Sequence, residues 1–296
     1  GLIGGSLLRA LGPDRTFGWN RSPAGAEAAT AAGFDVTTDL PTTLRRAAES
    51  DALVVVGVPL PALESVLGAV AEHAPTAALT DVISVKGPVL EAVRRHGLGA
   101  RFVGGHPMAG TAHSGWDAGD PDDDADPDTW GRVARLALDS GARVVAATSA
   151  DHDAGVARIS HLGHVLAEAL ALAGGRGGDL ALSLAAGSFR DGTRVAGTAP
   201  DLVRAICEPN RDALLDVLDE CLADLGAARA ALAERGTLGP LVDDGHRARR
   251  AYEDAQADRT GGDLRPAEVT PGAAGWLEAL REAGALGREV RLADRP

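Results

Sequence analysis

The sequence predicts an α/β fold in its first half, followed by an all-helical second half. Apolar strands alternate with helical stretches as far as residue 147, which is typical of a parallel sheet covered on both faces. A glycine-rich stretch at the start leads directly into a helical pattern, as in Rossmann-type dinucleotide-binding folds. We therefore expect a dinucleotide-binding domain over residues 1–147, and a helical domain for substrate binding and dimerisation over 148–296.

Composition narrows the classes of protein to which the chain can belong. Its 296 residues suffice for about two domains, and 45% apolar residues support well-buried cores. A net charge of −13 argues against nucleic acid or an anionic membrane surface as the main partner. No apolar run approaches the roughly 20 residues of a membrane span, and no signal segment opens the chain. Cys207 and Cys221 lie in helical patterns and indicate reduced thiols, so we expect a cytoplasmic protein. The net charge does not exclude a small anionic ligand, because a local site can differ in charge from the whole chain.

The first cofactor-binding candidates are Gly1, Leu2, Ile3 and Gly4. A Gly-x-x-Gly motif that enters a helix lets a pyrophosphate approach the helix N-terminus, where free N–H groups and the dipole attract it. The strand and first glycine of the full fingerprint do not precede this motif, so we expect the first strand of the sheet to be missing. An ordinary glycine-rich helix start is the alternative.

The next strand, over 16–20, would end near the adenosine ribose. Asn20, Arg21 and Ser22 stand where an acid would bind the 2′-hydroxyl of NAD, or an Arg the 2′-phosphate of NADP. Because Asn20 is not an acid and Arg21 is adjacent, the sequence favours tolerance of NADP. An exposed turn with a solvated Arg is the alternative.

Three segments that follow strands are expected to meet at one crevice, because the carboxyl ends of parallel strands share an edge of the sheet. They are Gly57–Leu60, Ser84–Gly87 and the glycine-rich stretch 104–115, which holds two histidines. For 104–115 a glycine-rich turn whose His caps a helix is the alternative. Before and between these segments the pattern predicts strands over 34–36, 52–56, 78–82 and 101–103, and helices over 23–32, 41–49, 61–73 and 88–96.

The second half carries polar residues within helical patterns. Ser160 and His164 lie four residues apart on one helix face, and no Cys or Glu completes a set at metal-ligand spacing, so we expect no metal site. At least one of Arg190 and Arg194 should meet a carboxylate, from Asp191 or from a substrate acid. The remaining elements are expected as an acidic loop over 117–128, helices over 129–140, 149–174, 200–207, 210–234, 238–256 and 273–283, and strands over 142–147 and, at a sheet edge, 288–292.

Five segments together resemble the prephenate dehydrogenase family of tyrosine biosynthesis, which includes arogenate dehydrogenases. The family fold has an N-terminal dinucleotide-binding domain and a helical C-terminal domain that forms a homodimer. The motifs around His106 and Arg194, in this order and spacing, are the most specific part of the resemblance. The segments are Gly1-Leu2-Ile3-Gly4-Gly5-Ser6, Asp81-Val82-Ile83-Ser84-Val85-Lys86, Gly105-His106-Pro107-Met108-Ala109-Gly110-Thr111, Ser160-His161-Leu162-Gly163-His164 and Phe189-Arg190-Asp191-Gly192-Thr193-Arg194-Val195-Ala196.

The resemblance implies an oxidative decarboxylation of prephenate to 4-hydroxyphenylpyruvate with NAD or NADP. His106 would accept the proton of the C4 hydroxyl group, to which Ser84 would hydrogen-bond. Arg194 would clamp a substrate carboxylate, and His164 and Ser160 would order the substrate or the nicotinamide. The other candidates that the resemblance supplies are Thr111 for substrate and Val58 and Pro59 for the cofactor.

The chain departs from the family pattern at several positions, and these departures leave other functions open. Ala112 stands where many relatives carry an acid, Val203 replaces a frequent Trp and Gly163 a frequent Pro, and acids fill 122–126 in place of an apolar strand. Arogenate dehydrogenase and an inactive or truncated remnant of the family are the alternatives. A β-hydroxyacid dehydrogenase would share the glycine motif, but such enzymes typically use a Lys in the helical domain, and Lys86 is the only lysine of this chain.

Overall fold

The computed structural model describes residues 1–108, 115–118, 126–261 and 265–293. Packing divides the chain into two units, the first formed by Gly1–His152 with Pro266–Pro296 and the second by Asp153–Arg265. The predicted ranges, 1–147 and 148–296, differ from this division because the C-terminal residues return to the first unit.

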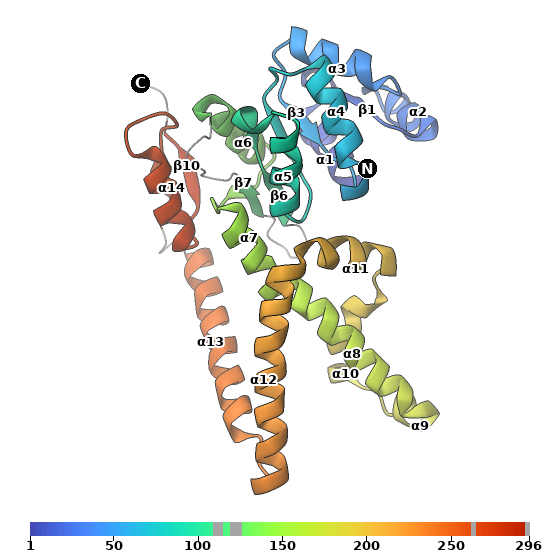
Figure 1. Ribbon diagram of the computed structural model, residues 1–296, viewed down its shortest axis with the longest axis vertical. Helices are drawn as coiled ribbons and strands as arrows, with labels where there is room; N and C mark the ends of the chain where they lie inside the picture. Colours follow the sequence, from blue (N-terminus) through green and yellow to red (C-terminus); the bar gives the residue numbers. More distant parts are fainter. Residues whose placement is uncertain (109–114, 119–125, 262–264, 294–296) are drawn as a thin grey trace. The chain divides into compact units, whose positions relative to one another are not determined.

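The first unit opens with a Rossmann-like alternation of helices and parallel strands (Figure 1). One parallel sheet pairs β1 (Phe17–Trp19) with β2 (Asp35–Thr37), and a second joins β3 (Val54–Val56), β4 (Leu79–Asp81) and β5 (Phe102–Val103) in that order. The helices are α1 (Leu2–Leu11), α2 (Pro23–Ala31), α3 (Leu40–Glu49), α4 (Leu63–His73) and α5 (Gly87–Arg95).

Helix α4 shows how the sequence builds the core of this region. Leu63, Val66, Leu67 and Val70 recur at the i, i+3, i+4, i+7 spacing of one helix face, and all four are buried. They join Val89 of α5 and Val56 of β3 in one apolar core. Burial of each such side chain contributes about 1.5–3 kcal/mol relative to exposure, so this core fixes the ends of β3 and β4.

A mixed sheet of five strands completes the first unit, in the order β6-β7-β8-β10-β9. Figure 1 shows α14 and β10, in red, near α6, and Trp130, Leu280 and Val290 from these elements share one apolar core. The elements are β6 (Gly105–Met108), β7 (Gly115–Ala118), β8 (Arg143–Val144), β9 (Ala267–Val269), β10 (Val290–Leu292), α6 (Pro127–Asp139) and α14 (Trp276–Ala285).

The sequence predictions for this sheet were wrong in two places. The predicted acidic loop 117–128 begins inside β7, which pairs antiparallel with β6 and parallel with β8. β6 itself lies within the glycine-rich stretch 104–115, for which no strand was predicted. The C-terminal strand, predicted at an edge, pairs on one side with β8 and on the other with β9. Long-range pairing supplies these strands, since Gly, Pro and Asp give no local strand signal.

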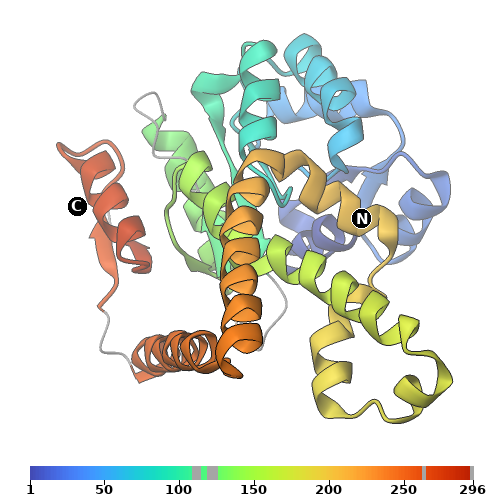
Figure 2. The same cartoon turned by 60° about the horizontal axis from the view of Figure 1, so that its bottom comes forward.

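The second unit is helical throughout its described residues, as the sequence predicted. It starts within α7 (Ser149–Val156) and passes through a π-helical turn, Ala157–His161, into α8 (Leu162–Arg176). α9 and α10 fold back along α8 (Figure 2), and Gly174 permits this because a Cβ there would overlap the ring of Phe189. The other helices are α9 (Gly178–Ser183), α10 (Gly187–Thr193), α11 (Pro200–Cys207), α12 (Arg211–Arg235) and α13 (Gly239–Gly261).

Candidate active site

A buried ion pair lies where β4 ends. Lys86 and Asp81 are 6% and 1% exposed, and the Nζ of Lys86 lies 2.5 Å from the Oδ2 of Asp81. The same Nζ donates to the carbonyl of Gly105 (2.7 Å), while the N–H of Gly105 donates to Oδ1 of Asp81 (3.1 Å). The N–H of Ile83 also donates to Oδ2 (2.9 Å). Both polar groups of the Gly105 peptide backbone are therefore held by the pair, directly before His106.

Asp81 and Lys86 belong to one of the motifs that resemble the family, but no role for either residue follows from the sequence alone. Gly104 supports the arrangement, because a Cβ there would lie 3.1 Å from Cδ of Lys86, which is tighter than an ordinary contact. The absence of a side chain at Gly104 therefore leaves room for the aliphatic part of the Lys86 side chain. A lone lysine in a chain rich in arginine was the signal that could have identified this site.

His106 lies on β6, half-buried, and its ring meets a second histidine. Nδ1 of His106 lies 2.9 Å from Nε2 of His152, and the two rings cross edge-on at 70°. His152 belongs to the first turns of α7 and is 6% exposed. His152 lies near the start of the helix predicted over 149–174, but nothing in the sequence links two histidines that stand 46 residues apart.

Ser84 lies on the turn between β4 and α5, two residues before Lys86, and is half-buried. Within the described structure, its hydroxyl group makes no hydrogen bond to His106. Its predicted contact with the substrate hydroxyl stays a prediction.

The N-terminus of α1 lies beside the end of β3. A Cβ on Gly1 would lie 4.0 Å from the carbonyl oxygen of Gly57, which directly precedes Val58 and Pro59. Gly1 caps α1 without a side-chain hydrogen bond, and a Cβ on Gly4 would meet open space. This arrangement fits the pyrophosphate of a dinucleotide. The first N–H groups of the helix have no side-chain cap, a ligand can approach the backbone, and the end of a strand lies beside it. Leu2 and Ile3 lie in the same helical turn.

The predicted ribose-binding residues form a compact turn after β1. Oδ1 of Asn20 accepts from the N–H of Ser22 (3.0 Å), and the Ser22 hydroxyl accepts from the N–H of Gly25, capping α2. A Cβ on Gly25 would press into the Asn20 amide, so this glycine is needed for the turn. Arg21 is exposed and has no ion-pair partner among the described residues. Its guanidinium group is available to a phosphate.

In the second unit, Ser160 and His164 are less buried than His161, which lies between them in the sequence. His161 is 1% exposed and its Nδ1 lies 3.1 Å from Nδ2 of Asn210, so it belongs to the packing of the unit. Ser160 and His164 are half-buried. Nδ1 of His164 is buried and lacks a hydrogen-bond partner among the described residues. A buried ring nitrogen of this kind is costly unless a ligand satisfies it.

Arg190 of α10 and Arg194 of the turn after it differ in their ion-pair partners. Nε of Arg190 lies 3.2 Å from Oδ1 of Asp191, so the internal carboxylate pairs with Arg190. Arg194 opens the 3₁₀ turn Arg194–Gly197, is exposed, and has no ion-pair partner among the described residues. Of the two, Arg194 is therefore the one whose charge is available to a substrate carboxylate.

Thr111 lies outside the described residues, as do Ala112 and most of the acidic stretch 122–126. In the part of the chain that is described, no group of three or more His, Cys, Asp or Glu is placed to hold a metal ion. No described helix is long and apolar enough to cross a membrane.

Known proteins match both halves of the chain. Family models match residues 4–123 as the nucleotide-binding domain, and 148–239 as the dimerization domain, of prephenate dehydrogenase. A cyclohexadienyl dehydrogenase of Zymomonas mobilis is 33% identical over 258 residues, which cover 79% of this chain and 87% of the relative.

Two solved structures are similar over most of their length. A protein of Corynebacterium glutamicum, provisionally described as a prephenate dehydrogenase, is 45% identical with a TM-score of 0.90, covering 99% of this chain and 96% of its own. The arogenate dehydrogenase of Synechocystis is 28% identical with a TM-score of 0.72, covering 85% and 96%. With a family model on each half and a relative matched over most of its length, the chain belongs to the prephenate dehydrogenase family, the NAD(P)-dependent oxidoreductases of tyrosine biosynthesis.

Proposed function

We propose that this chain catalyses the oxidative decarboxylation of prephenate to 4-hydroxyphenylpyruvate. The observation that carries the proposal is the contrast between its two neighbouring arginines. Asp191 forms an ion pair with Arg190 (3.2 Å), whereas Arg194 has no carboxylate partner among the described residues. Prephenate carries two carboxylates, and a planar guanidinium group binds a carboxylate through two hydrogen bonds. Arg194 is accordingly the residue that we assign to a substrate carboxylate.

His106 is the residue that we assign to proton transfer. When bound, NAD(P) accepts the hydride that leaves C4 of the substrate. His106 accepts the proton of the C4 hydroxyl group as the C4–H bond breaks, which leaves a ketone at C4. The bond between the ring and its carboxylate then breaks, carbon dioxide departs, and the electron pair enters the ring. The C4 oxygen takes the proton back from His106, so no proton is consumed and the ring becomes aromatic.

Residues of the second unit would order the substrate. The buried Nδ1 of His164 has no partner among the described residues and would be satisfied by a polar group of the ligand. Ser160, on the preceding π-helical turn, offers a hydroxyl group. Thr111, Ser84, Val58 and Pro59 keep the roles that the family resemblance implies.

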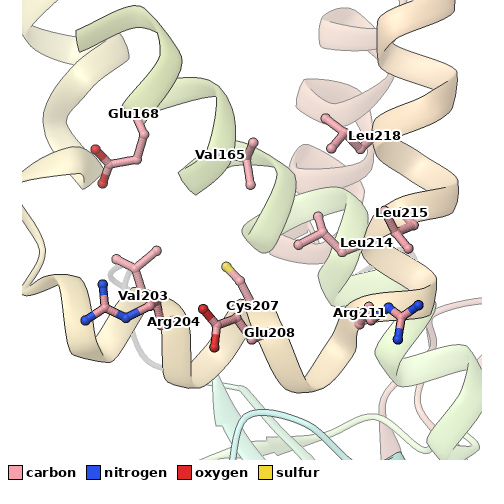
Figure 3. Close-up of a pocket in the computed structure, with 10 residues that line it drawn as sticks. All are labelled: Val165, Glu168, Val203, Arg204, Cys207, Glu208, Arg211, Leu214, Leu215 and Leu218. Atoms are coloured by element: carbon pink, nitrogen blue, oxygen red, sulfur yellow. The ribbon is translucent and has the colours of Figure 1, made fainter. Parts of the chain in front are cut away.

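A homodimer is the assembly that we propose, formed through the helical unit. A cavity of about 450 Å³ opens between α8, α11 and α12, and Figure 3 shows apolar side chains along its walls. Leu215 and Leu222 of α12 are 45% and 56% exposed. A second copy would cover these side chains. Leu215→Glu should therefore yield monomers in light scattering, whereas Leu286→Glu, outside this unit, should not; unchanged mass for both would contradict the assignment.

The decisive assay measures NAD(P)H formation from prephenate and from arogenate, each with NAD and with NADP. We expect the highest kcat/KM with prephenate. Arogenate dehydrogenase is the alternative, favoured by the similarity to the Synechocystis enzyme, and a strong preference for arogenate would establish it. Absence of turnover with every pair would favour an inactive member of the family.

Matched variants test the substrate site. Arg194→Gln should raise KM for prephenate by about 10-fold or more, since a charge-assisted pair is worth about 1.5–3 kcal/mol. Arg190→Gln removes an arginine of the same segment that already pairs with Asp191, and the KM of this variant for prephenate should stay within about twofold. Equal effects of the two substitutions would remove Arg194 from the carboxylate site.

A further inference from the structure

We propose that His152 is a positioning residue for His106: it accepts the Nδ1–H of His106 and so leaves Nε2 of His106 unprotonated for the substrate. The proposal rests on the proposed role of His106 as proton acceptor. Its basis is the 2.9 Å separation between Nδ1 of His106 and Nε2 of His152, with the rings edge-on at 70°. At this distance a proton must lie between the two nitrogens, because two bare lone pairs would repel each other.

The proton between the rings can belong to either one, and the choice decides whether His106 can act as a base. If Nε2 of His152 carries it, His106 accepts at Nδ1 and its neutral ring must carry its own proton on Nε2. If Nδ1 of His106 carries it, Nε2 of His106 is bare. Only the second arrangement presents an acceptor to the substrate hydroxyl group at Nε2. Proton acceptance by His106 therefore requires His152 to be the hydrogen-bond acceptor of the pair.

The same contact stabilises the product of proton transfer. Once His106 has taken the substrate proton at Nε2, its ring is an imidazolium and the Nδ1–H bond to neutral His152 becomes charge-assisted. His152 cannot carry a proton on Nε2 at that moment, since two N–H groups would then face each other. The pair thus holds one positive charge at a time, on the ring that contacts the substrate.

The surroundings of both rings favour a fixed geometry. His152 is 6% exposed, and its backbone N–H donates to the carbonyl of Thr148 (2.8 Å). The Thr148 hydroxyl accepts from the N–H of Asp151 (3.0 Å), which closes the first turn of α7. On the other side, the Asp81–Lys86 pair holds the peptide that precedes His106. A buried, backbone-anchored acceptor can select a tautomer, as a mobile surface group cannot.

Two substitutions of His152 separate positioning from structure. His152→Leu removes the acceptor, whereas His152→Gln places an amide oxygen near the position of Nε2 and can still accept the Nδ1–H. We expect kcat to fall about 10- to 100-fold in His152→Leu, with KM for substrate and affinity for NAD(P)H within about threefold, because the lost interaction is a charge-assisted hydrogen bond. We expect His152→Gln to recover most of kcat. His73→Leu, at a half-buried position in the last turn of α4, is the matched histidine control.

Each outcome of these measurements counts for or against the proposal. Unchanged kcat in His152→Leu would overturn it, as would an equal loss in His152→Gln. A parallel loss of NAD(P)H affinity and thermal stability would assign His152 to structure alone.

The tautomer can be observed directly and independently of turnover. The chain has eight histidines, so NMR spectra of ¹⁵N-histidine-labelled protein contain ring signals from eight residues. The signals that are missing from the spectrum of His106→Asn belong to the His106 ring. We expect the Nδ1–H form in the wild type and its loss in His152→Leu; the Nε2–H form in the wild type would refute the pairing. If the wild type oxidises neither prephenate nor arogenate, the proposed function fails, and the tautomer still decides the pairing.

Discussion

Replacing Lys86 by Met should destabilise the first unit strongly, because it leaves the Asp81 carboxylate buried without its counter-ion. Asp81 is 1% exposed, and among the described residues only the N–H groups of Ile83 and Gly105 would remain bonded to its carboxylate after the substitution. Removing one member of a buried pair costs about 3–5 kcal/mol. Two backbone hydrogen bonds remain, so we expect a value near the lower end, about 3 kcal/mol.

The assay can be confined to the relevant unit. All four tryptophans of the chain, at positions 19, 116, 130 and 276, lie in the first unit, so tryptophan fluorescence in urea reports its unfolding alone. Arg15→Met is the control, because Arg15 forms a surface pair with Asp139 (3.3 Å), and such pairs contribute about 0–1 kcal/mol.

The double variant Asp81→Asn with Lys86→Met tests the physical reason. If the cost arises from an unpaired buried charge, removing both charges should be less destabilising than the sum of the single substitutions, with a coupling of about 1–3 kcal/mol. Equal, small effects of Lys86→Met and Arg15→Met would refute the reasoning. Additive single effects would show that the two groups do not act as a pair.

Three further predictions concern other residues of the first unit, Gly104, Arg21 and Asp126. Gly104→Ala should destabilise the first unit by about 1–3 kcal/mol in the same fluorescence assay, since its Cβ would press on Cδ of Lys86; unchanged stability would contradict the contact. Arg21→Ala should raise KM for NADP about 10-fold or more and leave KM for NAD within about twofold, as steady-state assays would show; equal changes would remove Arg21 from the 2′-phosphate site. Asp126→Ala should cost about 1 kcal/mol, because Asp126 caps α6 through the N–H of Thr129 (3.0 Å). Burial raises the pKa of Asp126, but hydrogen bonds from Thr129 outweigh this effect and lower the pKa in the folded protein. The stability that the cap contributes is therefore complete above the pKa of the unfolded chain and is lost as the pH falls through the pKa of the folded protein. Equal urea midpoints of wild type and variant at neutral pH would argue against the cap.

Much of the fold follows from local pattern, and the exceptions have a common cause. The helix α4 and the strands β3 and β4 carry their own signals, in apolar spacing and in Val-rich runs. β7 carries none, because Gly115-Trp116-Asp117-Ala118 becomes a strand only through its pairing with β6 and β8. β10 lies inside its sheet because β9 and β8 pair on its two sides, and these pairings join residues far apart in the chain.

The candidate site divides in the same way. His106, Arg194 and the turn at Asn20 could be named from motifs, since each motif is local. The partners that distinguish these residues could not be named. The pairing of Asp191 with Arg190 was one of two possibilities in the sequence, and the contact between His106 and His152 depends on the placement of α7 beside β6.

The central claim is that His106 transfers a proton during oxidation of prephenate by NAD(P). The most direct measurement compares NAD(P)H formation from prephenate by the wild type and by His106→Asn, with the dissociation constant of NAD(P)H measured for both. We expect kcat to fall about 10²-fold or more in the variant while affinity for NAD(P)H stays within about twofold. A variant that oxidises prephenate at the wild-type rate would contradict it.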